Sequence, residues 1–246
     1  MKRFALIGRR LGHSYSQQWF EGFFARLGLA DHVYTLCEMP SLEGLREWVE
    51  SEGICGFNVT VPYKQEILPC LDALDETAET IGAVNCVTVE DGRLVGHNTD
   101  AGAFRRSLEN TGWPVRQAFI LGTGGAARAV AFALRQMEIP YQFVSRHPHG
   151  GNQMGYEELA TLHSPLPTLL VNATPVGMFP DVDGTPLPDL NLHFSTFNLY
   201  DLTYNPSPTR LMRDAMSRGA QVKDGLEMLH LQAEMSWNFY RKVTCG

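Results

Sequence analysis

A glycine-rich turn in the middle of the chain, residues 122–125, constrains the fold more than any other feature. The preceding run, Gln117 to Leu121, is apolar and of strand type, and Ala126 to Met137 has the composition of a helix. Gly122-Thr123-Gly124-Gly125 joins the two directly. A strand, a glycine turn and a helix in direct succession predict a βαβ unit, with parallel strands and right-handed crossovers.

The alternation of short apolar runs with longer amphipathic stretches extends over nearly the whole chain, which is typical of α/β architecture. Predicted strands cover residues 3–7, 33–36, 54–60, 84–90, 93–96, 117–121, 141–144, 168–171, 196–200 and 220–222. Predicted helices cover 16–27, a segment capped by Ser41, 100–110, 126–137 and 225–240. Asp91-Gly92 lies between two predicted strands and predicts a hairpin.

The character of the chain changes near residue 100, where the hairpin gives way to the βαβ series. We therefore expect two α/β domains with a cleft between them. The first consists of residues 1–100, joined by the C-terminal helix 225–246. The second, residues 101–224, is expected to be a doubly wound domain of the Rossmann type. Closure of such a cleft would exclude water from a bound ligand.

Charge and hydropathy argue against several classes of protein. The formal net charge is −7, with no block of like charge, whereas a nucleic-acid binder usually carries a basic face. No run approaches the roughly 20 apolar residues of a membrane span, and the apolar stretch before Gly8 is too short for a secretory signal. We therefore expect a cytoplasmic protein that binds neither nucleic acid nor membrane.

The cysteines predict neither a disulfide framework nor a zinc ribbon. There are five of them, an odd number, and no C-x-x-C spacing occurs. We expect scattered reduced thiols and no metal site.

The glycine turn, in its context between a strand and a helix, predicts a dinucleotide-binding loop. Glycines allow a pyrophosphate to approach the backbone, and the helix N-terminus offers free N–H groups to it. NAD binders place an acid about 20 residues on, at the end of the next strand. Here that strand is followed by Ser145-Arg146, and Glu138 is the only acid between Gly125 and Tyr156. Arg146 can bind a 2′-phosphate through charge-assisted hydrogen bonds, so the sequence favours NADP. The alternatives are a tight turn without a ligand and a solvated arginine.

Polar side chains follow several predicted strands in the first half of the chain, where ligands bind in open α/β folds. These residues are Ser14, Ser16, Asn58, Thr60, Lys64, Asn85 and Asp100. Their hydroxyls, amides, single amine and single carboxylate would suit a small polyhydroxylated acid. Each also has a structural alternative. Asp100 could cap its helix, Ser14 or Ser16 could cap the first helix, and Lys64 could be a solvated surface residue.

Taken together, these segments resemble the shikimate dehydrogenase family at nearly every motif, from Ala5 to about Ala233. The matching segments are Ser14-x-Ser16, 58–64, 82–85, 98–100, 122–128, Ser145-Arg146, 172–178, 201–206 and 225–233. The chain departs from the family pattern at Gln17, where proline is usual, and at Thr123, where alanine is common. It departs again at Ser145 and His147, in place of asparagine and threonine.

The resemblance implies an NADP-dependent oxidoreductase of the shikimate pathway of aromatic amino acid biosynthesis. It would reduce 3-dehydroshikimate reversibly to shikimate by hydride transfer, with NADP(H) as cofactor and a small-molecule partner only. Lys64 would donate the proton to the new alkoxide in reduction and accept it in oxidation, and Asp100 would hold the same hydroxyl and position Lys64. We expect a monomer or a homodimer.

The resemblance also assigns binding roles to residues in both halves of the chain. The implied substrate-binding residues are Ser14, Ser16, Asn58, Thr60, Asn85, Tyr204 and Gln232. The implied cofactor-binding residues are Gly122, Thr123, Gly124, Gly125, Ala126, Ser145, Arg146, Asn172, Thr174 and Gly225. The two serines would hold the substrate carboxylate, and the amides and Thr60 its ring hydroxyls.

Three alternatives remain open at this point. The nearest is a quinate or dual quinate/shikimate dehydrogenase, against which Ser16 and Arg146 argue in this family. A non-catalytic ligand sensor on the same fold is disfavoured because both Lys64 and Asp100 are present. A folate-linked or aminoacyl-linked dehydrogenase of similar two-domain design fits the serine pair and Asn98-Thr99-Asp100 poorly.

Overall fold

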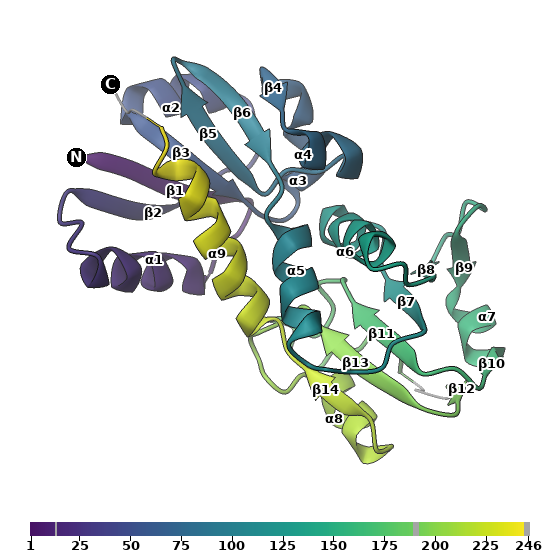
Figure 1. Ribbon diagram of the computed structural model, residues 1–246. Helices are drawn as coiled ribbons and strands as arrows, with labels where there is room; N and C mark the ends of the chain where they lie inside the picture. Colours follow the sequence, from purple (N-terminus) through teal and green to yellow (C-terminus); the bar gives the residue numbers. More distant parts are fainter. Residues whose placement is uncertain (13, 189–191, 244–246) are drawn as a thin grey trace. The chain divides into compact units, whose positions relative to one another are not determined.

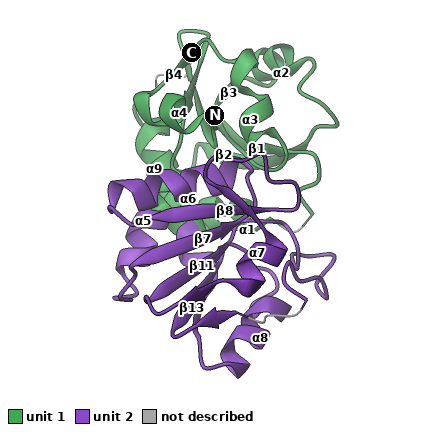
Figure 2. Cartoon of the chain, turned by 90° about the vertical axis from the view of Figure 1, so that its right-hand side faces the viewer, with its two compact units in different colours: residues 1–103, 229–246 green, residues 104–228 purple. Residues whose placement is uncertain are grey.

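The computed structural model describes residues 1–12, 14–188 and 192–243. The chain forms two compact units, one made of residues 1–103 with 229–246 and the other of residues 104–228 (Figure 2). The last three residues of the predicted C-terminal helix segment, 244–246, lie outside the described residues. Each unit has its own six-stranded sheet.

The sheet of the first unit is mixed. Its strands are β1 (Lys2–Gly8), β2 (His32–Glu38), β3 (Ile54–Val59), β4 (Ala73–Leu74), β5 (Cys86–Glu90) and β6 (Arg93–His97). Their order is β2-β1-β3-β5-β6-β4, in which β5 runs antiparallel to both β3 and β6. The predicted hairpin is confirmed: Asp91 and Gly92 join β5 to β6, both with positive φ.

Helices pack on both faces of this sheet (Figure 1). The helices of this unit are α1 (Tyr15–Arg26), α2 (Leu45–Glu52), α3 (Tyr63–Glu66), the 3₁₀ turn η1 (Leu68–Cys70), α4 (Glu76–Ile81), the start of α5 (Asp100–Glu109) and most of α9 (Leu226–Tyr240). Alternate residues of β1 point to opposite faces. Ala5 and Ile7 join a core with α2, α3 and α4, whereas Phe4 and Leu6 join an aromatic core with α1 and α9.

The second unit is built around an all-parallel sheet. Its strands are β7 (Gln117–Leu121), β8 (Tyr141–Ser145), β9 (Gln153–Gly155), β11 (Thr168–Asn172), β13 (Phe197–Asp201) and β14 (Gln221–Lys223). Its helices include α6 (Gly125–Gln136), α7 (Tyr156–Thr161) and α8 (Arg210–Ser217), and β10 (His163–Ser164) pairs separately with β12 (His193–Phe194).

The strand order of this second sheet is β14-β13-β11-β7-β8-β9. Counted along the unit, this is the doubly wound order 3-2-1-4-5-6, read from the β9 edge, and it confirms the predicted α/β fold class. The direction of winding reverses between β7 and β11. Ligands bind outside the carboxyl ends of the strands at such a switch point. The segments following Leu121 and Asn172, which are direct neighbours in register, lie there.

Several local predictions differ from the structure. Helix α2 begins at Leu45 rather than near Ser41, because Gly44 turns the chain in the left-handed region while the Ser41 hydroxyl accepts only from the Glu43 N–H. The short helices α3, α4, α7 and α8 were not predicted, since one to two turns give too little periodicity to recognise.

Two further points concern the cysteines and the membrane. Cys37, Cys70 and Cys86 are free thiols, but Cys55 is disulfide-bonded, so the expectation of reduced thiols is wrong at that position. Within residues 1–12, 14–188 and 192–243, no helix has the length and apolar content to cross a membrane.

Candidate active site

Lys64 and Asp100 form a close ion pair in the first unit. Lys64 lies in the first turn of α3, just past the end of β3, and Asp100 opens α5. The Lys64 Nζ donates to Asp100 Oδ2 at 2.6 Å, and the two side chains are only 16% and 6% exposed. The structure therefore brings together the two residues to which the family resemblance assigns the proton transfer. An ammonium held by one carboxylate oxygen keeps two N–H groups for a ligand.

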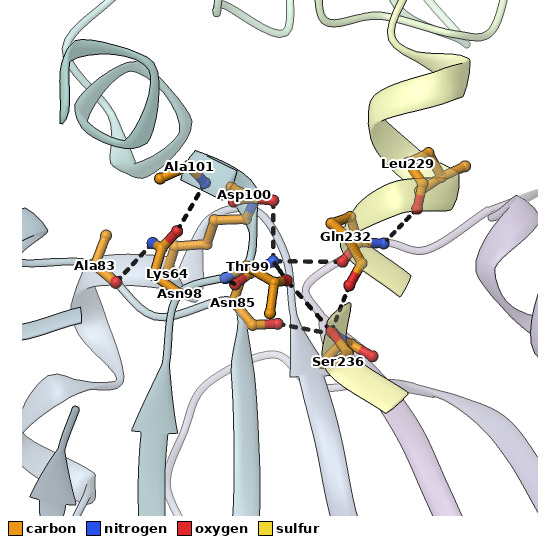
Figure 3. A network of polar contacts seen from close by, with 11 residues as sticks. Lys64, Ala83, Asn85, Asn98, Thr99, Asp100, Ala101, Leu229, Gln232 and Ser236 are labelled. Atoms are coloured by element: carbon orange, nitrogen blue, oxygen red, sulfur yellow. Dashed lines mark hydrogen bonds and ion pairs between the residues drawn. The ribbon is translucent and has the colours of Figure 1, made fainter. Parts of the chain in front are cut away.

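Asn85 holds the other oxygen of the Asp100 carboxylate (Figure 3). Its Nδ2 donates to Asp100 Oδ1 at 2.9 Å and to Thr99 Oγ1 at 2.8 Å, while its Oδ1 accepts from the Thr99 N–H at 2.7 Å. Both carboxylate oxygens of Asp100 are thus engaged. This excludes the alternative in which Asp100 caps its own helix: Asn98 Oδ1 accepts from the Ala101 N–H instead.

Helix α9 brings Gln232 to the same cluster. Gln232 Oε1 lies 3.3 Å from Asn85 Nδ2, and its Nε2 donates to the Leu229 carbonyl at 2.9 Å. Asn58, at the end of β3, donates from Nδ2 to the Asn85 carbonyl at 3.1 Å. Hydrogen bonds therefore connect five of the predicted site residues, Asn58, Lys64, Asn85, Asp100 and Gln232.

The remaining predicted residues of this unit follow β1 and β3. Ser14 is the N-cap of α1 and its Oγ accepts from the Ser16 N–H at 3.3 Å, so the capping alternative is correct for Ser14. Ser16 is buried in the first turn of α1. Thr60 follows β3, and its N–H donates to the carbonyl of Ile7 on β1. An added Cβ on Gly8 would lie 2.8 Å from the Thr60 methyl, so glycine permits this close approach.

Glu38 anchors the loop that leads to Ser14, and the sequence did not reveal it. Its Oε1 accepts from the backbone N–H groups of Leu11 at 2.7 Å and Gly12 at 3.3 Å. These two hydrogen bonds, that of Leu11 first, lower the pKa of the Glu38 carboxyl below its ordinary value.

A second layer of polar side chains supports the Asn98-Thr99-Asp100 segment. His97, which precedes it, is buried and contacts Asp75 Oδ2 through Nδ1 at 2.8 Å and Thr88 Oγ1 through Nε2 at 3.0 Å. The His97 carbonyl accepts from the Asn85 N–H. None of these contacts is local in sequence, so no sequence motif indicates them.

The glycine turn of the second unit has the form of an anion-binding site. Gly122 has φ +104°, and a Cβ there would lie 3.1 Å from the Thr174 methyl. Among the described residues, no heavy atom lies within 4 Å of a Cβ added to Gly124, the N-cap of α6, so these residues leave open space above it. Thr123 is exposed, and Gly125 and Ala126 form the first turn of α6, whose N–H groups lack intrahelical acceptors.

Ser145 and Arg146 lie beside this turn, at the end of β8. The Gly122 N–H donates to the carbonyl of Val144 at 2.9 Å, which fixes the turn against the strand that ends in Ser145. The Ser145 hydroxyl accepts from the His147 N–H, and the Arg146 side chain is exposed.

The segments following β11 and β13 are joined through a buried carboxylate. Asn172 Nδ2 donates to Asp201 Oδ1 at 3.0 Å, and Asn172 Oδ1 accepts from both the N–H and the hydroxyl of Thr174. Asp201 is fully buried; burial raises its pKa, and the Thr203 N–H and the Thr209 hydroxyl oppose that rise. Asp201 is the first residue of the matching segment 201–206, but the resemblance gave it no role.

Gly225 and Tyr204 complete the predicted set. The Gly225 N–H donates to the Thr203 carbonyl, and a Cβ on Gly225 would lie 2.0 Å from the Leu202 carbonyl oxygen. Only glycine fits this contact. Tyr204, predicted to bind substrate, is half-buried in the segment after β13, within the second unit.

Comparisons with known proteins show the family to which this chain belongs. The model of the shikimate dehydrogenase substrate binding domain matches residues 6–87. The shikimate dehydrogenase (NADP(+)) of Caldicellulosiruptor bescii is 33% identical, over 96% of this chain and 89% of that protein. The chain belongs to the shikimate dehydrogenase family. Another member, the shikimate dehydrogenase (NADP(+)) of Nostoc sp., is 37% identical, over 93% of this chain and 86% of that protein.

The family fold extends over both units. The crystal structure of shikimate 5-dehydrogenase from Thermus thermophilus in complex with NADP(H) and shikimate has a TM-score of 0.86 to this chain. Its sequence is 34% identical, and the match covers 100% of this chain and 95% of that one. The resemblance identified from the sequence motifs is therefore confirmed.

Proposed function

We propose that this protein is an NADP-dependent shikimate dehydrogenase, an oxidoreductase that converts 3-dehydroshikimate and shikimate into one another. The main support for the proposal is the ion pair of Lys64 and Asp100. Its Nζ and Oδ2 atoms lie 2.6 Å apart at one end of a buried polar network. We assign substrate binding to residues 1–100 with 225–246, and cofactor binding to residues 101–224. A cytoplasmic location and the monomeric or dimeric state stay predictions.

Lys64 is the group that moves the proton. Reduction of a ketone leaves an alkoxide, which an adjacent N–H must protonate, and oxidation requires the reverse transfer. The Lys64 ammonium has two N–H groups besides the one bound to Asp100. Asp100 keeps Nζ in place and remains an acceptor after Lys64 has given up its proton. Asn85, bound to Asp100 Oδ1, fixes the plane of that carboxylate.

The substrate carboxylate would bind at the start of α1. The hydroxyls of Ser14 and Ser16 would donate to it, and the free N–H groups of the first turn favour an anion at this end of the helix. Thr60 and the amide of Gln232 would bind ring hydroxyls. Binding of the substrate by Tyr204 stays a prediction.

The residues of the second unit fit a dinucleotide. The open space over Gly124 leaves room for a pyrophosphate against the first turn of α6, and Gly122, Thr123, Gly125 and Ala126 would surround it. Arg146 and Ser145 would bind the 2′-phosphate, and no acid stands at that strand end to repel it. The rest of the dinucleotide site would be lined by Asn172, Thr174 and Gly225. When bound, NADP(H) supplies or accepts the hydride.

The rate of absorbance change at 340 nm tests the proposal. Purified protein is mixed with shikimate or quinate and with NADP⁺ or NAD⁺, in all four combinations. We expect turnover with shikimate and NADP⁺ and little with the other pairs. Preference for quinate would contradict the substrate assignment, preference for NAD⁺ the Arg146 assignment, and the absence of turnover with all four pairs the enzymatic function itself.

A further inference from the structure

The side-chain amide of Asn58 has every hydrogen-bonding position occupied by protein groups. Its Nδ2 donates to the Asn85 carbonyl at 3.1 Å and to Ser236 Oγ at 2.8 Å. Its Oδ1 accepts from the hydroxyls of Tyr34 and Tyr240, each at 2.9 Å. An amide has two donors and two acceptor lone pairs, so nothing is left over for a ligand.

A series of hydrogen bonds leads from Asn58 through Ser236 to Asp100, and in each bond only one partner can be the donor. Figure 3 shows the part from Ser236 to Asp100. Ser236 gives its only hydrogen to the Gln232 carbonyl, and therefore accepts from both Asn58 and Thr99. Thr99, donating to Ser236, accepts from Asn85 Nδ2. The second N–H of Asn85 is then available to Asp100 Oδ1, which at 2.9 Å lies nearer than Gln232 Oε1 at 3.3 Å. The orientation at Asn58 is thus transmitted to the carboxylate that holds Lys64.

The two tyrosines at the start of this chain are rigidly held. Tyr34 lies on β2 and its ring stacks on Phe20, with centroids 4.1 Å apart. Tyr240 ends α9, and its ring packs so closely on Gly56 that an added Cβ would lie 2.7 Å from it. Both side chains are buried, and burial raises the pKa of each hydroxyl well above 10, so both remain donors.

We infer that Tyr34 and Tyr240 are positioning residues for the reaction, which act through Asn58 and Asn85 on the Asp100 carboxylate. Asn58 itself belongs to this support rather than to the ligand-binding set. The inference rests on the proposed function, because it is that reaction which Lys64 and Asp100 carry out. Low dielectric around such a network makes the loss of one donor costly to its neighbours.

The test compares Tyr34→Phe and Tyr240→Phe with Tyr63→Phe. Tyr63 is a matched control, because it is equally buried in the same unit and its hydroxyl donates to the Met39 carbonyl, outside the network. We expect all three variants to lose a similar amount of thermal stability. Tyr34→Phe and Tyr240→Phe should lower kcat about three- to tenfold, the effect of roughly one hydrogen bond. They should also move the pH profile of kcat, whereas Tyr63→Phe should do neither.

A double variant of Tyr240→Phe with Asn58→Ala shows whether Tyr240 affects kcat through Asn58 or independently of it. Once Asn58 is removed, Tyr240→Phe should change kcat by less than about twofold further, because coupled residues are not additive. Full additivity, or tyrosine variants indistinguishable from Tyr63→Phe in kcat and pH profile, would overturn the inference. If Asn58→Ala does not fold, the comparison of single variants decides.

A readout without catalysis keeps this test distinct from that of the proposed function. In ¹H–¹⁵N spectra, the side-chain amide resonances of Asn58 and Asn85 should shift in Tyr240→Phe and stay unchanged in Tyr63→Phe. Unmoved amides would contradict the network whether or not the wild type turns over shikimate. If the amide resonances shift in Tyr240→Phe and the wild type has no activity, the result would support the network and reject only the proposed reaction.

Discussion

The two ends of the proposed reaction are built by different means. At the substrate end, buried side chains from β3, α5 and α9 hold one another in a network that ends at Asp100. At the cofactor end, the glycine turn presents backbone N–H groups and open space, and Arg146 extends into solvent. The first end therefore depends on long-range side-chain contacts, and the second on local backbone geometry.

This difference also explains what could be predicted from the sequence. The turn at Gly122, the strand before it and the helix after it are contiguous, so one motif gives their structure. Lys64, Asn85 and Asp100 were found because each opens or follows an element and the family motifs mark them. Tyr34, Ser236 and Tyr240 are separated from Asn58 by 24 to 182 positions, and nothing in their local sequence distinguishes them from core residues.

The greatest loss of stability is expected at the cofactor end, which depends on backbone geometry. Gly225→Ala should destabilise the fold by about 3 kcal/mol or more, because its Cβ would lie 2.0 Å from the backbone carbonyl oxygen of Leu202. Gly22→Ala is the control, since its Cβ would meet open space within helix α1, and alanine there should stabilise by roughly 0.5–1 kcal/mol. Urea unfolding measures both. Equal stabilities would show that the backbone contact is not a constraint.

Asp100→Asn should have the largest effect on catalysis at the side-chain end. The amide cannot hold the Lys64 ammonium as a carboxylate does, so kcat should fall by about 10²-fold or more while NADPH affinity is unchanged. Asp31→Asn removes an exposed carboxylate that contacts the adjacent His32 ring, and should leave kcat within about twofold. A similar small effect at Asp100 would contradict its role.

Arg146→Ala tests the one charged group that we place at the cofactor end. NADPH binding should weaken by about 1.5–3 kcal/mol, the contribution of a hydrogen bond to a charged group, while NADH kinetics barely change. Arg135→Ala, an exposed arginine at the end of α6, serves as control for the lost surface charge. Titration of both variants with both cofactors gives the result; equal losses for NADPH and NADH would reject the 2′-phosphate assignment.

Glu38→Ala should give the smallest effect. Without the acceptor for the N–H groups of Leu11 and Gly12, the loop before Ser14 should become less ordered, and the KM for shikimate should rise roughly fivefold. Because the folded-state pKa of Glu38 is lowered, the anchor is present above its ordinary value of 4.5 and is lost only as the pH falls through the lower one. The difference from wild type should therefore persist down to about pH 4.5. Glu47→Ala, on the exposed face of α2, is the control.

Proton transfer by the Lys64–Asp100 pair can be measured through the single-turnover kinetics of Lys64→Ala. The absorbance change at 340 nm is followed with enzyme in excess over NADP⁺ and with saturating shikimate, beside Lys242→Ala as an exposed control. We expect a first turnover at least about 10²-fold slower in Lys64→Ala, with both ligands still bound, and a normal rate in Lys242→Ala. A near-normal first turnover in Lys64→Ala would contradict it.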